Sequence, residues 1–143
     1  MKEFEPPLRR YEERWNDWRQ KQPRLADLRN ILLTHGGTEM VPQREPDVDE
    51  LVENGRLLET TEEILIEGPD IDCHTNAAYF YLDRPDITEV GTGWALSDDG
   101  LWRQHSWTMR GDELVETTVP RELYYGVLLS GKNAKLFADK NRL

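Results

Sequence analysis

The 143-residue chain contains a single cysteine, Cys73, and only three histidines. One cysteine excludes a disulfide within the chain, and the spacings CxxC, HxxxH and HExxH that mark common zinc sites are absent. No segment approaches the roughly 20 consecutive apolar residues of a transmembrane helix. No apolar stretch follows the first residues as it would in a signal peptide. We therefore expect a cytoplasmic protein that does not bind membranes and whose thiol stays reduced.

Basic residues are also scarce: 18 Lys and Arg face 28 Asp and Glu, giving a net charge of −10. Proteins that bind nucleic acid usually carry the opposite sign because they neutralise phosphates, so we expect no nucleic-acid partner. A cationic substrate or partner would suit this charge, although an acidic surface also serves solubility alone. The oligomeric state cannot be read from the sequence.

The composition nevertheless predicts a folded protein, because five Trp and five Tyr can bury much area. A single domain of 1–143 is expected, beginning with a helical hairpin in 1–37. Apolar residues recur at helical spacing in 8–22 and again in 24–35, where Gly36-Gly37 ends the second helix. The aromatic face of the first helix suits packing on the domain, or alternatively a partner protein.

A connecting region is expected in 38–69, with a short helix at 47–54 and a turn at Gly68-Pro69-Asp70. Within it, 64–66 favours a short buried strand, although the acids around these residues would suit a helix. The core is expected in 70–143. There Asp72 can cap a helix over 73–83. The strands expected next are 89–97, 101–109, 113–119 and 124–129, followed by a helix at 132–140. Asp99-Gly100 is a strong hairpin signal. The predicted fold class is α+β, with a Cys-bearing helix packed on a small antiparallel sheet.

Cys73 opens the predicted helix, and this position has chemical consequences. Unpaired N–H groups and the positive end of the helix dipole stabilise a thiolate, which is the nucleophilic form of cysteine. The same helix end can donate an N–H to an oxyanion on a substrate. Asn76 lies one turn further on, where it would hold the preceding loop or donate to that oxyanion.

A base and an orienting acid can be assigned on the predicted strands. His105 lies in the middle of the second strand and shares a face with Trp107, which would cover the imidazole. Glu116 follows across the turn at Gly111-Asp112 and is the best-placed group to fix the ring tautomer. His74 is a rival base, but side chains of adjacent helical residues diverge by about 100°.

The order Cys73, His105-Ser106-Trp107 and Glu116-Thr117-Thr118 resembles the transglutaminase-like branch of the papain-like cysteine enzymes. In that core the nucleophile begins a helix, the base lies in a His-x-Trp strand motif, and an acid follows on the next strand. The resemblance covers about 70–120. It implies a papain-like fold and a Cys-His-acid triad, here with Glu116 in place of the usual Asp.

We therefore expect a small enzyme that transfers acyl groups from an amide or ester through a thioester on Cys73. Water would make it a hydrolase, and an amine would make it a transferase. The substrate would be a small molecule or a peptide or protein amide, and no cofactor is expected. Trp94, Trp102 and Trp107 would line the cleft, unless they belong to the core.

Two other interpretations remain open at this stage. Cys73, His74, His105 and an acid would suffice to bind zinc, although their spacing matches no established ligand motif. A single cysteine is also often a small buried apolar residue. In that case the protein would be a non-catalytic acidic binding or regulatory protein with a degenerate papain-like fold.

Overall fold

The computed structural model describes residues 5–58, 62–68 and 72–142. Within these ranges the helices are α1 (Glu5–Lys21), α2 (Leu25–His35), α3 (Val48–Asn54), α4 (Cys73–Asp83) and α5 (Gly131–Asn141). The strands are β1 (Glu39–Met40), β2 (Arg56–Leu57), β3 (Glu62–Leu65), β4 (Glu89–Leu96), β5 (Leu101–Arg110), β6 (Glu113–Glu116) and β7 (Leu123–Leu129). The predicted α+β class is confirmed. The turn predicted at 68–70 lies partly outside the described residues.

All the described strands join one mixed sheet, so the prediction of an antiparallel sheet is wrong for two of its strands. The path runs β2-β7-β4-β5-β6-β3, and β1 pairs with β5 off this path. The β1–β5 and β3–β6 pairs are parallel. Parallel neighbours need a long connection, and α4 with the β4–β5 hairpin provides it between β3 and β6. The strands β1, β2 and β3 thus come from the region 38–69, which was expected only to connect the hairpin to the core.

The β4–β5 hairpin is the centre of the sheet, and its turn forms where the sequence predicts it. Eight residues of β4 pair with β5, from Glu89–Met109 to Leu96–Trp102. Gly100 adopts a φ of +86°, which is readily accessible only to glycine. A carboxylate oxygen of Asp99 accepts the backbone N–H of Leu101 at 3.1 Å. The turn fixes the register and thereby decides which β5 side chains share a face.

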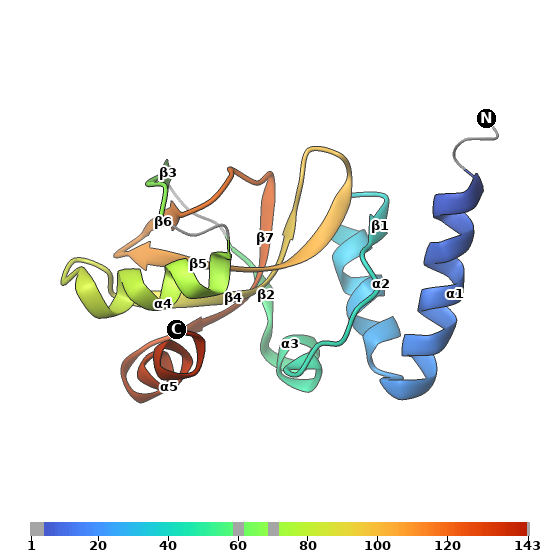
Figure 1. Cartoon of the computed structure of the whole chain (residues 1–143), viewed down its shortest axis with the longest axis horizontal. Helices are drawn as coiled ribbons and strands as arrows, with labels where there is room; N and C mark the ends of the chain where they lie inside the picture. The colour runs from blue at the N-terminus through green and yellow to red at the C-terminus, as the bar shows by residue number, and fades with distance from the viewer. Residues whose placement is uncertain (1–4, 59–61, 69–71, 143) are drawn as a thin grey trace.

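The helices gather at two ends of the sheet (Figure 1). Figure 1 shows α1 and α2 together at one end of the molecule and α4 and α5 at the other. The first end buries the largest apolar cluster, which contains Trp15, Leu28, Trp94 and Trp102. At the other end, small residues of α4 and α5 pack against β4 in a separate cluster made of Ala77, Val90 and Ala134. Two packed regions thus share one sheet.

The sheet is strongly curved. Tyr124 of β7 donates its hydroxyl to Glu63 of β3 at 2.6 Å, although β7 is second and β3 last along the strand path. Such a contact requires the two ends of the sheet to approach each other. The curvature buries Trp107 and Leu114 in a further cluster with Tyr124. Among the described residues, no helix is long and apolar enough to cross a membrane.

Candidate active site

The site begins at the N-terminus of α4, which starts at Cys73 as predicted. Asp72 is the N-cap: one carboxylate oxygen accepts the N–H of His74 at 2.9 Å, and the other accepts the Thr75 hydroxyl at 3.1 Å. Such a cap satisfies helix N–H groups that would otherwise lack a partner. Cys73 is therefore fixed in the first turn of α4, and its side chain remains partly exposed.

His105 lies where the sheet leaves one side of β5 without a paired strand. On the side away from β4, β1 pairs with Leu101 and Trp102, and β6 pairs only from Thr108 onwards. Between these two partners no described strand pairs with β5. The N-terminal end of α4 approaches there, and the Cys73 side chain lies close enough to the His105 imidazole to raise the pKa of that ring. The break in strand pairing thus allows a helix residue to reach a buried strand residue.

Glu116 completes the predicted set of three. Its Oε1 lies 2.7 Å from Nε2 of His105, and both side chains are almost fully buried, 0% and 1% exposed respectively. An ionised carboxylate can only accept hydrogen bonds, so the Nε2 atom carries the proton that is donated to Glu116. The other ring nitrogen, Nδ1, is thereby left to interact with the thiol. In the neutral ring it can accept the thiol proton.

The Glu116 carboxylate is held by hydrogen bonds on both oxygens. Oε2 accepts the N–H of Thr117 at 3.1 Å, the N–H of Thr118 at 3.0 Å and the Thr118 hydroxyl at 2.9 Å. Oε1 also accepts the Tyr124 hydroxyl at 2.7 Å. Burial alone would raise the pKa of Glu116, but the bonds from His105, Tyr124 and Thr118 outweigh it and lower the pKa. Glu116 is therefore a buried anion at neutral pH.

The surroundings of His105 favour its charged form. Burial disfavours an imidazolium, yet the hydrogen bonds to Cys73 and Glu116 and the charge of Glu116 raise the pKa of His105 above its ordinary value. A protonated His105 beside the thiol would stabilise a thiolate by ion pairing. The arrangement therefore supports proton exchange between Cys73 and His105.

His74 is directed elsewhere. Its Nδ1 lies 2.6 Å from the hydroxyl of Ser106, which in turn donates to the Thr92 hydroxyl at 3.0 Å. Ser106 follows His105 on β5, so the two side chains point to opposite faces of the sheet. The His74 ring therefore lies on the face opposite to the His105 ring. Burial lowers the pKa of His74, which favours the neutral ring. Of the two histidines, His105 is the one whose ring is hydrogen-bonded to a carboxylate.

Trp107 covers the imidazole. Its ring stacks beside that of His105, with centroids 6.1 Å apart and an interplanar angle of 28°. The indole is fully buried and lies against Gly91 of β4, where any Cβ would approach its atoms to 2.1 Å. Glycine at this position is thus a steric requirement for the indole. The ring shields the His105–Glu116 pair from water.

The other predicted site residues lie in structural positions. Trp94 and Trp102 belong to the cluster under α1 and α2, and their indole N–H groups donate to Glu45 and to the Gly36 carbonyl, each at 2.9 Å. The structure thus places both in the core and does not bring them to Cys73. Asn76 is 1% exposed, and its amide donates to the Thr117 carbonyl at 3.3 Å. This contact ties α4 to the segment after β6.

Tyr124 and Thr118 are contacts of Glu116 that the sequence reasoning missed. The contact of Thr118 could have been inferred from the sequence, because Thr118 follows Glu116 in the same short motif. No sequence feature indicates the contact of Tyr124 with Glu116, because only the curvature of the sheet brings β7 to β6. Glu63 of β3 enters the same network through Tyr124 for the same reason.

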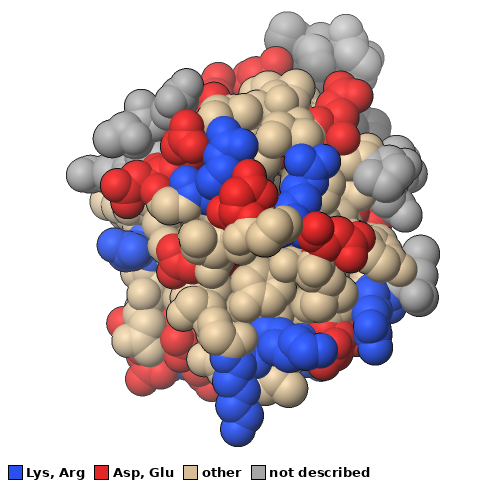
Figure 2. All heavy atoms as spheres, turned by 90° about the vertical axis from the view of Figure 1, so that its left-hand side faces the viewer, with Lys and Arg blue, Asp and Glu red and all other residues tan. Residues whose placement is uncertain are grey.

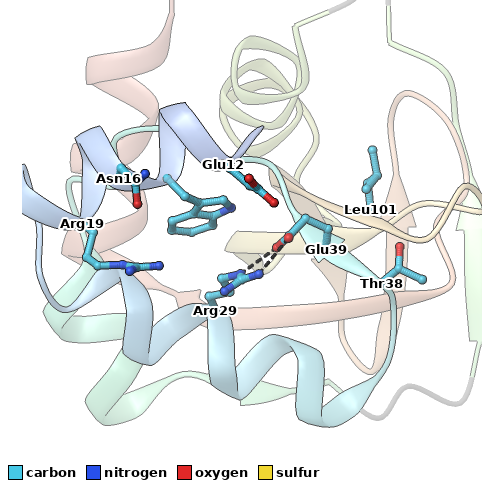
Figure 3. A pocket seen from close by; sticks show the side chains of 8 residues that line it. Glu12, Asn16, Arg19, Arg29, Thr38, Glu39 and Leu101 are labelled. Carbon is cyan, nitrogen blue, oxygen red and sulfur yellow. Dashed lines mark hydrogen bonds and ion pairs between the residues drawn. The ribbon is translucent and has the colours of Figure 1, made fainter. Parts of the chain in front are cut away.

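Metal binding receives no support from the described residues, among which no group of three or more His, Cys, Asp or Glu side chains is arranged to hold an ion. A cavity of about 450 Å³ lies at the opposite end of the molecule, between α1, α2 and β1 (Figure 3). Figure 3 shows Arg29 bonded there to Glu39, at 2.7 and 2.8 Å. The cavity is therefore separate from Cys73 and contains a neutralised ion pair.

Comparison of the chain with family models, with curated proteins and with solved structures gave no match.

Proposed function

We propose that this protein is a cysteine-dependent acyl-transfer enzyme that acts on an amide or ester. The observation that carries the proposal is the buried hydrogen bond between His105 and Glu116, with the Cys73 side chain close enough to His105 to raise the pKa of the imidazole. These residues come from α4, β5 and β6, and their order in the chain resembles that of the transglutaminase-like enzymes. A nucleophile, a base and a buried acid that orients the base form the minimal set for nucleophilic catalysis.

The reaction would proceed in two halves. In the first, the Cys73 proton moves to His105 and the sulfur attacks the acyl carbon, so that the carbonyl π electrons move to oxygen. The tetrahedral species collapses to a thioester, and His105 returns the proton to the leaving amine or alcohol. In the second half, water or an acceptor amine loses a proton to His105 and attacks the thioester. The thiolate then leaves and is reprotonated by His105.

Glu116 has a positioning role in this scheme. By accepting the Nε2–H bond it fixes the ring so that Nδ1 faces the sulfur, and its charge stabilises the imidazolium that forms. The backbone N–H groups at the start of α4 are suited to stabilising an oxyanion, although the N–H of His74 is already bonded to Asp72. Hydrolysis and transfer use the same residues and differ only in the second nucleophile.

The face of the molecule on the side of α4 carries side chains of both signs. Figure 2 shows the face on the side of α4, with acidic and basic side chains interspersed around uncharged residues. A surface of mixed sign produces no single steering field. We therefore define the proposed substrate by the acyl group that is transferred and not by its charge.

An activated ester tests the proposal, because the chain contains only one thiol. With p-nitrophenyl acetate, the parent should release nitrophenolate in a burst and carry one acetyl group on Cys73, as measured by intact mass and peptide mapping. Cys73→Ser should show neither the burst nor the thioester. If acetylation of the native parent is no faster than that of the protein unfolded in urea, the proposal is wrong.

A further inference from the structure

The Tyr124 hydroxyl has one proton but two carboxylate neighbours. It lies 2.7 Å from Oε1 of Glu116 and 2.6 Å from Oε1 of Glu63. A phenol can donate only one hydrogen bond at a time. Burial, followed by the charge of Glu116 and the hydrogen bond to Glu63, raises the pKa of Tyr124 well above its ordinary value, so the hydroxyl stays protonated. Its proton must therefore be shared between the two acids.

The two acids differ in what else they accept. Glu116 is fully buried and receives four further hydrogen bonds, from His105, Thr117 and Thr118. Glu63 is exposed, and its Oε1 accepts one other hydrogen bond, from the backbone N–H of Arg121 at 3.3 Å. Protein groups thus provide the hydrogen-bond donors of Glu116, whereas Glu63 is exposed to solvent. Tyr124 connects them.

We propose that Tyr124 is a positioning residue of this site, and that Glu63 competes with Glu116 for its hydroxyl proton and so sets how strongly Glu116 holds the His105 imidazolium. The proposal rests on the function proposed above. When the hydroxyl turns to Glu63, Glu116 loses one donor and becomes a stronger partner for the imidazolium. When the hydroxyl turns to Glu116, the carboxylate is better neutralised and the imidazolium is held less firmly.

Among the residues that the structure describes, the following charged or titratable groups interact with this chain of bonds. From α4, Cys73 and His74 face His105, and Asp72 acts on His74. From β6, Glu116 faces both His105 and Tyr124. The guanidinium of Arg121 donates to the Val119 carbonyl instead of to Glu63. The variants below leave all of these groups in place.

The test is a titration of the His105 ring, followed by NMR of protein labelled with ¹⁵N-histidine. Tyr124→Phe removes the donor to Glu116 and should move the His105 midpoint upward by about half a pH unit or more. Glu63→Gln removes the competing charge and should move it downward by a similar amount. In the double variant Tyr124→Phe/Glu63→Gln, the midpoint should match that of Tyr124→Phe, because Glu63 acts through the hydroxyl.

Tyr125→Phe is the matched control, since Tyr125 donates its buried hydroxyl to the Leu51 carbonyl, in a different cluster. It should leave the His105 midpoint unchanged. Glu63→Gln keeps the test valid if Tyr124→Phe fails to fold, because Glu63 is exposed. Shifts of the same sign in both single variants would overturn the proposal. So would a Glu63→Gln effect that persists in the Tyr124→Phe background, because that would be a through-space charge effect.

The alkylation rate of Cys73, measured on the same samples, separates this proposal from the enzymatic one. Opposite shifts of the His105 titration midpoint together with an unreactive thiol would support the role of Tyr124 and contradict the proposed enzymatic function. If the reactivity of the thiol depends on His105 but the two midpoint shifts are not opposite, the role of Tyr124 is contradicted and the enzymatic proposal stands.

Discussion

Glu116 is the residue whose environment is most specific, because every donor around it is placed for a carboxylate. A glutamine there would turn an N–H₂ group toward existing donors, either His105 and Tyr124 or the N–H groups of Thr117 and Thr118. Breaking a buried ion pair from one side costs about 3–5 kcal/mol. Glu116→Gln should therefore lower the free energy of unfolding by about that amount, as measured by urea denaturation at neutral pH.

The lowered pKa of Glu116 also predicts how stability depends on acid. An unfolded glutamate takes up a proton near its ordinary pKa of about 4.3, whereas the folded one stays ionised to lower pH. The stability that Glu116 contributes is thus present above about pH 4.3 and is lost as pH falls through the folded pKa. Urea titrations between about pH 3 and 7 should show a shallower acid decline in Glu116→Gln than in the parent. The exposed Glu122→Gln should follow the parent, and an unchanged slope in Glu116→Gln would contradict this account.

At the scale of single elements, the start of α4 depends on its cap. Asp72→Ala removes the acceptors of His74 N–H and of the Thr75 hydroxyl, and should cost about 0.5–2 kcal/mol. Fraying of the first turn would also move Cys73 away from His105 and slow its alkylation. Asp72→Asn is the matched control, since asparagine caps helices equally well. The interpretation fails if the Ala and Asn variants are alike in thermal midpoint and in thiol reactivity.

The elements themselves could largely be predicted from sequence because their signals are local. The cap at Asp72 and the turn at Gly100 each depend on residues within four positions, and both were located correctly. The pairing of β1 and β3 could not be predicted, since strands of two and four residues have too little pattern to show parallel partners. Tyr124 was missed for a related reason, because sheet curvature has no local signature. Whether Trp94 and Trp102 line a cleft or belong to the core could not be decided from sequence, because aromatic residues in adjacent strands suit both.

At the scale of the whole molecule, the sheet joins two packed regions that should respond separately to mutation. Leu28 is fully buried in the cluster with Trp94 and Trp102, which contains no residue of α4. Leu28→Ala should cost about 2–5 kcal/mol by cavity formation. It should leave the alkylation rate of the folded protein at about pH 6 within twofold of the parent. Leu136→Ala, at an exposed position of α5, is the control for stability. A thiol reactivity that falls in step with stability would show that the two regions are coupled.

The most direct test of the account is the rate at which iodoacetamide alkylates Cys73 from about pH 5 to 9, compared between the parent and His105→Gln. Glutamine keeps a donor for Glu116 but cannot hold the proton of the thiol, and His35→Ala serves as a control outside the site. We predict that the parent thiol is alkylated at least about tenfold faster than that of His105→Gln, and that His35→Ala matches the parent. A parent rate that is unaffected by His105→Gln would contradict the account and indicate a binding protein instead.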